Sequence, residues 1–468
     1  MDLRMLCEEV SQKITPSEED KRKVQNLSKD LIRRIEEEAA KLKINVNPAL
    51  VGSIAKDTWI KTNPEIDIFI VFPRSYTKEE IGELGLKIAR KITGDKGKEQ
   101  YAEHPYLRAE VEGFQVDFVP SFEISNATER ISAVDRTPLH TSYIKKNLDE
   151  SLKKEVRLLK QFLMGINAYG AEIKVGGFSG YLCELLLVKY PSFQNLLEAC
   201  IKWKSRHIID IEHHYAEEKE IQKIFSEPLV VIDPVDPKRN VSAALTNQKI
   251  GEFKAAAKAF LEAPSENFFF PRQITPFKPE ELQNLIQTKG TDTLFLVFET
   301  PNIPPDTLWG QLYKSQDAIK NFLESEDFKI TNEGVWSQEE KTILVFEFES
   351  AIISKTYRHL GPPTGSVGQK PFIKKYIKSE KSISGPRIED GRWVVELPRK
   401  YTKADKLVDY EIRNKLNSLG LGKYIANKIS EHFDLFLNVE ISNIYSKNPD
   451  FAKFLTKYYS GKPSWLPT

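Results

Sequence analysis

The sequence predicts an α+β protein of several domains: a mixed-sheet head, a mostly helical neck, an α/β body and an α/β tail. Residues 51–72 (VGSIAKDTWIKTNPEIDIFIVF) and 112–120 (EGFQVDFVP) contain the two-residue alternation typical of strands. From residue 142 to 270 the apolar residues recur mainly at helical spacing, and beyond residue 270 strands and helices alternate again. A chain of 468 residues is long enough for about three or four domains of ordinary size.

The domain boundaries are expected where these patterns change. Residues 1–141 form the head, residues 142–270 the neck, residues 271–381 the body and residues 382–468 the tail.

The head is expected to begin with a long amphipathic helix. The stretch Thr15-Pro16-Ser17-Glu18 predicts a capping box with proline at the first helical position. A strand–helix–strand pattern follows to about residue 141 and forms one α/β unit. The apolar residues expected to face the core of this unit from the helix are Val24, Leu27, Leu31, Ile35 and Ala39.

The neck, body and tail each have their own pattern of elements. Helical spacing marks residues 181–188 of the neck, among others. In the body, strands at 293–298 and 342–348 flank a helix at 308–323. Aromatic residues on these strands are typical of a core, and also of a platform on which RNA bases stack. The tail has a strand at 392–397, followed by helices.

Composition and cysteine usage exclude several classes of protein. The chain is 29% charged and 40% hydrophobic, and its formal net charge of +1 gives no overall basic bias. Cys7, Cys183 and Cys200 contain no Cys-x-x-Cys pair, which argues against a disulfide framework or a zinc site. No apolar run reaches the roughly 20 residues of a membrane span. The N-terminus lacks a secretory signal, so we expect a cytoplasmic protein without a membrane partner.

Two carboxylates share one face of the predicted strand that starts at residue 65. Residues two apart in a strand point the same way, about 7 Å apart, so Glu65 and Asp67 project together. Such carboxylates repel each other and lose hydration unless a cation lies between them, which predicts a Mg²⁺ site. An acid–x–acid pattern is also typical of an exposed polar face. Apolar residues on both faces of this strand favour the metal site.

A third carboxylate and a glycine–serine turn support this interpretation. Asp117 alternates with apolar neighbours and lies opposite their face, although a turn cap next to Pro120 is the alternative for it. If the two strands pair, three carboxylates converge, as is typical of sites where two ions activate a hydroxyl and stabilise a leaving pyrophosphate. Gly52 and Ser53 supply a flexible turn and a hydroxyl just before an expected helix start, a place suited to phosphate.

The order of these motifs resembles a known family. Gly-Ser, then Glu-x-Asp, then a distant Asp between apolar residues is the signature of the DNA polymerase β-like nucleotidyltransferases, so the head resembles a nucleotidyltransferase domain. The chain as a whole resembles the archaeal, class I CCA-adding tRNA nucleotidyltransferases, densely over the first 270 residues and more thinly beyond. The further blocks that carry this resemblance are RISAVDRTPLHT (130–141), VRLLKQFL (156–163), YGAEIKVGGFSGYLCELL (169–186) and VIDPVDPKRNVSAAL (231–245).

The resemblance implies template-independent addition of C-C-A to the 3′ end of tRNA from CTP and ATP. It implies that Glu65, Asp67 and Asp117 are catalytic and hold two Mg²⁺ ions, with pyrophosphate as the leaving group. The residues implied to bind the nucleotide are Ser53, Lys56, Thr137, His140, Lys160, Tyr169 and Arg239.

Several of these implied contacts have an ordinary alternative. Lys56 stands where the family has arginine, so it keeps the charge but loses the bidentate fork. A lone His140 in a polar stretch and a helical Lys160 are otherwise typical of solvent-facing side chains.

In the family, the arginine that matches Arg239 reads the incoming base. A guanidinium can donate to cytosine O2 and N3 or to adenine N1, but it cannot satisfy the donor edge of guanine or uracil N3–H. We expect Asp236 either to brace Arg239 or to cap a helix.

The resemblance also implies partners and a division of labour. It implies a neck that binds nucleotide and a homodimer. The strand aromatics indicate a body that binds RNA, and the charge of the C-terminal segment indicates a tail that binds tRNA. Residues 371–468 carry 18 Lys and Arg against 11 Asp and Glu. This excess favours the tail as the tRNA surface, although an ordinary solvated surface can carry the same excess.

Two other functions are compatible with these motifs. One is a template-free poly(A) polymerase or an oligoadenylate synthetase-like enzyme of the same superfamily. The other is a catalytically dead RNA-binding relative, but such relatives usually lose an acid, whereas Glu65, Asp67 and Asp117 are all present here.

Overall fold

The computed structural model describes residues 2–62, 64–101 and 105–466, and it divides into two compact units. The first unit comprises the chain up to residue 273 together with the segment from residue 463 onward, and the second comprises residues 274–462. Helices and strands occur in both units, around several separate sheets, so the predicted α+β class is confirmed. Within the described residues, no helix combines the length and apolar character needed to cross a membrane.

The structure has a helix before the predicted one, and the predicted helix starts two residues later than expected. They are α1 (Leu3–Ile14) and α2 (Glu18–Lys41). The Ser17 hydroxyl accepts from the Asp20 backbone N–H, and the Asp20 carboxylate accepts from the Ser17 N–H. The predicted cap at Thr15, with Pro16 in the first helical position, is therefore wrong, because Ser17 and Asp20 satisfy the free N–H groups of α2. The predicted apolar stripe of this helix is confirmed as buried.

The head contains a five-stranded sheet in the order β1-β2-β5-β4-β3. Only β2 and β5 pair in parallel among its ladders, so this is the mixed sheet that the sequence predicts. Its strands are β1 (Asn47–Val51), β2 (Glu65–Phe72), β3 (Gly97–Tyr101), β4 (Pro105–Val111) and β5 (Phe114–Phe122), and its helices are α3 (Gly52–Ala55) and α4 (Lys78–Thr93).

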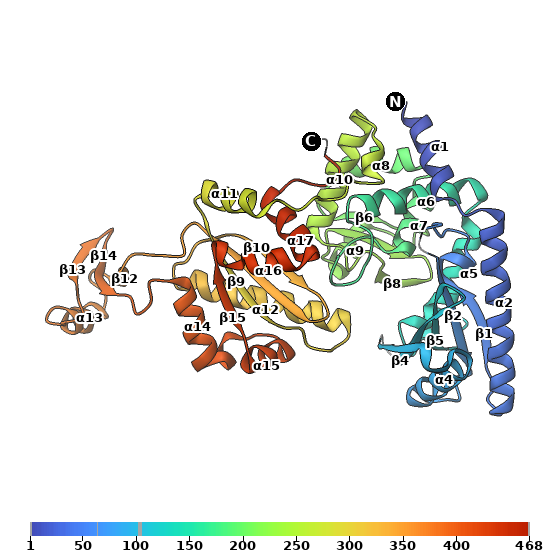
Figure 1. Ribbon diagram of the computed structural model, residues 1–468, viewed down its shortest axis with the longest axis horizontal. Helices are drawn as coiled ribbons and strands as arrows, with labels where there is room; N and C mark the ends of the chain where they lie inside the picture. Colours follow the sequence, from blue (N-terminus) through green and yellow to red (C-terminus); the bar gives the residue numbers. More distant parts are fainter. Residues whose placement is uncertain (1, 63, 102–104, 467–468) are drawn as a thin grey trace. The chain divides into compact units, whose positions relative to one another are not determined.

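The two faces of β2 have different neighbours. Ile66 and Ile68 share one hydrophobic core with residues of α2 and α4, which cover that face of the sheet (Figure 1). Glu65 and Asp67 alternate with them and therefore lie on the opposite face. On β5, the residues on either side of Asp117 join the same core, so Asp117 also points to the face that the helices leave free.

The neck is mostly helical, as predicted, with one small sheet. Its core also receives Leu6, Val10 and Ile14 of α1, and Trp465 stacks on Phe268 at a centroid distance of 5.2 Å. The elements of the neck are α5 (Thr137–Asn147), α6 (Glu150–Gly165), α7 (Gly180–Lys189), α8 (Phe193–Ile201), β6 (His207–Ile209), α9 (Glu218–Ile224), β7 (Leu229–Asp233), β8 (Asp236–Asn240) and α10 (Asn247–Glu262).

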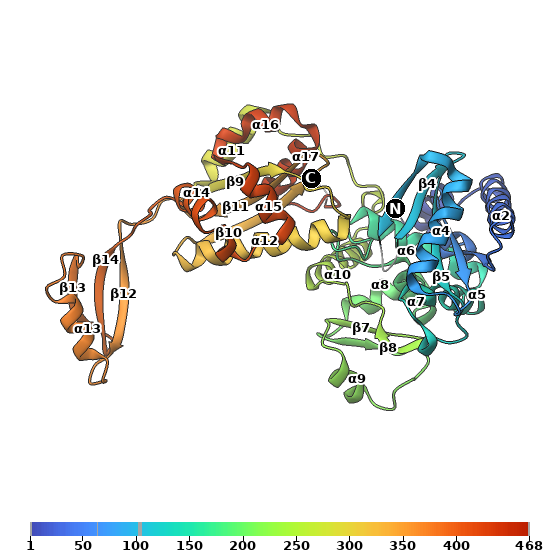
Figure 2. The same ribbon diagram turned by 90° about the horizontal axis from the view of Figure 1, so that it is seen from below.

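The second unit has a four-stranded antiparallel sheet between two groups of helices. Figure 2 shows the sheet with α12 on one side and with α11, α16 and α17 on the other. The aromatic residues of its central strands are buried, so they belong to the core and do not form an exposed stacking platform. In sheet order the strands are β10 (Ile330–Ser337), β11 (Lys341–Phe348), β9 (Asp292–Glu299) and β15 (Asp434–Leu437), and the helices are α11 (Pro279–Lys289), α12 (Pro305–Ser325), α14 (Ala404–Lys415), α15 (Lys423–Glu431), α16 (Ser442–Lys447) and α17 (Pro449–Ser460).

Hydrogen-bonded strands cross the boundary expected between residues 381 and 382. Strand β15, from the expected tail, pairs with β9 of the expected body. A second, three-stranded sheet also crosses it, in the order β12-β14-β13. Its strands are β12 (Thr356–Pro363), β13 (Ser384–Glu389) and β14 (Arg392–Pro398), and its helix is α13 (Gln369–Tyr376).

Candidate active site

Three carboxylates lie on neighbouring strands at the centre of the head sheet. The parallel register of β2 and β5 pairs Glu65 with Gln115 and Asp67 with Asp117. Adjacent strands are about 4.8 Å apart, so Asp67 and Asp117 lie side by side. Glu65 projects from the same face two residues earlier. The structure thus brings the three predicted acids together.

Gly52 holds the glycine–serine turn against this acidic face. Its φ is +72°, and a Cβ at this position would lie 1.9 Å from Asp67 Oδ2. Only glycine permits both the left-handed backbone and this close approach. Ser53 follows inside α3, because the helix begins at Gly52 and not after Ser53 as expected.

Arg108 pairs with the third acid. It lies directly opposite Asp117 across β4 and β5. Its Nε donates to Asp117 Oδ1 and its Nη2 to Oδ2, both at 2.7 Å. This bidentate bond raises the pKa of Arg108 above its ordinary value. Among the described residues, no group of three or more His, Cys, Asp or Glu side chains is arranged to hold a metal ion.

Asp67 experiences the unbalanced charge of this face. Burial, followed by the negative charges of Asp117 and Glu65, raises the pKa of Asp67 to about 7. Lys56 and Arg108 act in the opposite direction without cancelling this effect. The carboxylates therefore favour any further positive charge that approaches them.

Fully buried Glu184 of α7 binds two of the predicted nucleotide-binding lysines. Lys56 Nζ lies 2.5 Å from Glu184 Oε2, and Lys160 Nζ lies 3.6 Å from Oε1. Thr58 donates its hydroxyl to Oε1 at 2.6 Å and accepts from Lys160 at 3.2 Å. Burial lowers the pKa of Lys160. Although burial alone would raise it, the two lysines hold the pKa of Glu184 below its ordinary value.

The alternative interpretation of Lys160, a solvated lysine on a helix, is therefore wrong, because its side chain is only 3% exposed. Tyr169 lies beyond the end of α6, close to the same corner. A Cβ on Gly180 would meet the Tyr169 hydroxyl at 3.1 Å and Lys160 Nζ at 3.7 Å. The ammonium and the phenol thus converge at the first turn of α7.

His140 and Thr137 lie on α5, three residues apart and hence on neighbouring positions of one helix face. His140 is buried, which excludes the solvent-facing alternative, and it stacks on Tyr181 at a centroid distance of 4.0 Å. Its Nε2 lies 2.9 Å from Asp233 Oδ2. Burial lowers the pKa of His140, so the neutral ring donates its Nε2–H to the Asp233 carboxylate.

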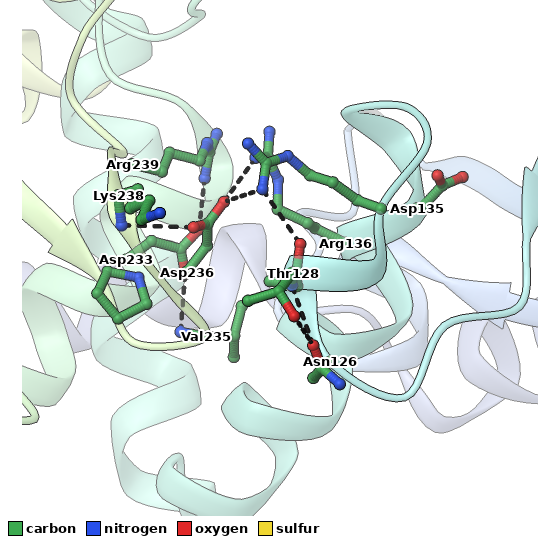
Figure 3. Close-up of polar contacts among 12 residues, drawn as sticks. Asn126, Thr128, Asp135, Arg136, Asp233, Val235, Asp236, Lys238 and Arg239 are labelled. Carbon is green, nitrogen blue, oxygen red and sulfur yellow. Dashed lines mark hydrogen bonds and ion pairs between the residues drawn. The ribbon is translucent and has the colours of Figure 1, made fainter.

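Arg239 is braced by Asp233 and not by Asp236. Arg239 Nη1 donates to Asp233 Oδ2 at 2.8 Å. Asp236 lies 2.9 Å from Arg136 Nη1 (Figure 3). It also lies 3.3 Å from Arg130 Nη1. Both expected roles for Asp236, a brace for Arg239 or a helix cap, are wrong, because it starts strand β8 and is engaged by these two arginines.

A series of contacts leads from Arg239, the candidate for reading the base, toward the carboxylates of the head sheet. Lys56 Nζ lies 5.8 Å from the ring centroid of Tyr181, which stacks on His140. The charge of Lys56 also acts on the Asp67 carboxylate and lowers its pKa. Lys56 of the head and His140 and Arg239 beyond it are thus linked through Tyr181 and Asp233.

Sequence reasoning missed four residues that organise this site: Arg108, Tyr181, Glu184 and Asp233. Glu184 carried a signal, since it is the one acid in the apolar helix GYLCELLLVK. A buried acid in such a helix needs a cationic partner. Nothing local identified its partners, because Lys56 lies 128 residues away in the sequence.

Family models and curated relatives match this chain over most of its length. A nucleotidyltransferase domain matches residues 32–140, the second domain of tRNA nucleotidyltransferase matches 154–270, and the C-terminal domain of the CCA-adding enzyme matches 289–438. The CCA-adding enzyme of Methanosarcina acetivorans is 36% identical over 96% of this chain and 97% of its own. That of Methanosarcina barkeri is 37% identical over the same shares.

More distant archaea give the same result. The CCA-adding enzyme of Halobacterium salinarum is 34% identical over 98% of this chain and 99% of its own. A solved cytoplasmic RNA terminal U-transferase aligns with a TM-score of 0.43 and 18% identity, over 56% of this chain and 94% of that one. The near full-length identity to the curated archaeal enzymes is decisive: the chain belongs to the family of archaeal CCA-adding enzymes, which are tRNA nucleotidyltransferases.

Proposed function

We propose that the protein completes the 3′ end of tRNA with C-C-A, from CTP and ATP, at the face formed by Glu65, Asp67 and Asp117. The observation that carries this proposal is the parallel register that sets Asp67 beside Asp117, on the sheet face opposite the helices. Lys56 of the head acts on Asp67 electrostatically and shares Glu184 with Lys160 of the neck, while Arg239 of the neck is held by Asp233. They supply the positive charge that a triphosphate and a base require.

The donor set fits Mg²⁺. Glu65, Asp67 and Asp117 offer only oxygen atoms, which Mg²⁺ prefers. The raised pKa of Asp67 supports the fit, because the carboxylates lack compensating charge. Two bound Mg²⁺ ions would supply Lewis-acid stabilisation of the triphosphate and of the attacking hydroxyl. To bind a metal ion, Asp117 would have to free an oxygen from Arg108, which otherwise holds the carboxylate in place through two hydrogen bonds.

Asp117 assists removal of the proton from the primer 3′-hydroxyl as the oxygen attacks the α-phosphate in line, and pyrophosphate leaves.

The remaining residues of the site bind and orient the nucleotide. Ser53 donates its hydroxyl to a phosphate oxygen, while Lys160 and Tyr169 donate to the β- and γ-phosphates. Thr137 and His140 line the triphosphate pocket. Arg239 presents its N–H groups to the base, which favours C and A over G and U.

Replacing Asp67 tests this assignment. The Asp67→Asn variant should lose nucleotide addition by about 1,000-fold or more, because the two-metal site loses a charged ligand. Its binding to tRNA, measured by filter retention, should stay within twofold of wild type. Glu110→Gln, an exposed acid on neighbouring β4, is the matched control and should keep full activity. Undiminished addition by the Asp67 variant would contradict the assignment.

Other parts of the proposal rest on resemblance and composition. Exposed lysines on and just after α13, at the end of the body, suit a tRNA backbone and support the body as an RNA-binding surface. The excess of Lys and Arg in residues 371–468 supports the adjoining tail as a tRNA-binding surface. The free cysteines Cys7, Cys183 and Cys200 suit a reducing cytoplasm. A homodimer is proposed from resemblance, and light scattering coupled to gel filtration measures it directly.

A further inference from the structure

Asp233 is not among the predicted site residues, yet its carboxylate accepts four hydrogen bonds. It ends β7 with no exposed surface and receives side chains from α5, α7 and β8. We propose that Asp233 is the positioning residue that fixes Arg239 and thereby sets the choice of CTP and ATP over UTP and GTP. This inference rests on the proposed function, in which Arg239 reads the base.

Four donors saturate the Asp233 carboxylate. Oδ2 accepts from Arg239 Nη1 at 2.8 Å and from His140 Nε2 at 2.9 Å. Oδ1 accepts from the Tyr181 hydroxyl and from the Val235 backbone N–H, both at 3.1 Å. A carboxylate has about four acceptor positions, so none remains free. The carboxylate cannot rotate without breaking at least two of these bonds.

Charge also ties Arg239 to this position. His140 is neutral, so Arg239 supplies the only full positive charge among the four donors. If Arg239 swung away, it would leave a buried anion without a counter-ion, which is costly. Although burial alone would raise it, His140 and Arg239 hold the pKa of Asp233 at about 2. Asp233 is thus ionised throughout the working range of pH.

The fixed guanidinium keeps donors available for a base. Arginine has five N–H donors, and Asp233 uses one of them on Nη1. The Arg239 side chain is 32% exposed, so part of it reaches the open side of the site. A planar donor group held at one end can discriminate between hydrogen-bonding edges, whereas a freely rotating one adapts to several edges. Selectivity among nucleotides should therefore depend on Asp233.

Asp236 provides a matched control within the same hairpin. It is also buried and also paired with arginine, but its partners are Arg136 (Figure 3) and Arg130. Asp236→Asn therefore removes the same chemical group from the same hairpin without touching the bond to Arg239. It separates a specific effect on Arg239 from a general disturbance of the hairpin.

The test measures kcat/KM for CTP and UTP, each supplied alone, on full-length protein with tRNA that lacks its CCA end. Asp233→Asn keeps the volume and one carbonyl oxygen but removes the negative charge and opposes one pair of the four donors with an NH2 group. The CTP-to-UTP ratio should fall about 10- to 100-fold, the range for a lost charge-assisted hydrogen bond. KM for CTP should rise more than kcat falls, and tRNA binding should stay within twofold. Asp236→Asn should keep the ratio within about twofold.

Two further variants separate the possible failures. Arg239→Gln should lower the ratio at least as far, and the double variant with Asp233→Asn should match it, because Asp233 acts through Arg239. If Asp233→Asn folds poorly, Asp233→Glu keeps the charge, displaces the carboxylate and should still lower the ratio.

An unchanged ratio in Asp233→Asn or Asp233→Glu, beside a collapsed ratio in Arg239→Gln, would overturn the inference and leave the proposed function intact. An equal loss in Asp236→Asn would also overturn it, because the effect would not be specific to Arg239. An unchanged ratio in Arg239→Gln would instead overturn the base-reading role within the proposed function, and this inference with it.

Discussion

Removing the charge of Glu184 should destabilise the first unit strongly. Glu184 is fully buried, and its partners Lys56 and Lys160 are 8% and 3% exposed. Glu184→Gln would leave two buried ammonium groups facing a neutral amide. Stranding one buried charge costs about 3–5 kcal/mol. Stranding two should cost at least as much.

The loss should be visible as a lower melting temperature. A loss of about 3–5 kcal/mol corresponds to a shift on the order of 10 °C for a unit of this size. Differential scanning calorimetry of the ligand-free protein resolves the transition of this unit. Glu37→Gln, which breaks the exposed pair with Arg33, should shift the same transition by about 1–2 °C at most.

A second substitution isolates the charge effect from packing. Lys160→Met in the Glu184→Gln background removes one stranded ammonium, so it should recover a large part of the lost melting temperature. CTP should also stabilise Glu184→Gln more than wild type, because its triphosphate can replace the missing anion. A shift below about 2 °C in Glu184→Gln would refute the reasoning, since the lysines would then not depend on this carboxylate.

Three further predictions concern the acid face and the tail. The pKa of Asp67 is raised to about 7, so below that pH a metal ion must displace its proton. The affinity for Mn²⁺, measured by electron paramagnetic resonance, should therefore fall as pH drops from 7 to 5 and level off above pH 8. A pH-independent affinity would contradict this. Gly52→Ala should lower kcat about 100-fold or more, because its Cβ would displace Asp67, whereas Gly94→Ala, also at positive φ but with free space, should cost stability only. Changing Lys374, Lys375 and Lys378 to Glu, at the border between body and tail, should weaken tRNA binding. It should also reduce the slope of log Kd against log salt by roughly one for each phosphate that the variant no longer neutralises. An unchanged slope would exclude these lysines from the tRNA-binding surface.

Much of the acid face could be predicted from the sequence, because it depends on the two-residue period of strands. That period alone puts Glu65 and Asp67 on one face, and the apolar neighbours of Asp117 indicate its strand. The choice of helix cap failed because Thr15 and Ser17 both fit the cap pattern, and only the backbone turn decides between them.

The partners of the neck residues could not be predicted in the same way. Lys56 and Glu184 are 128 residues apart, and His140 and Asp233 are 93 apart. Such pairs depend on how the head and neck elements pack, which no local pattern encodes. The pairing of Arg239 with Asp233 and not with Asp236 depends on the turn between β7 and β8, which directs each carboxylate to a different arginine.

The most direct test of the central claim is the product length formed on tRNA that lacks its CCA end. The assay contains Mg²⁺ and full-length protein, with CTP alone, ATP alone or both, and products are resolved to one nucleotide on a denaturing gel. We predict two additions with CTP alone and three with both nucleotides, ending in a single A. A long A-tract, or no addition at all, would contradict the assignment of this site to C-C-A synthesis.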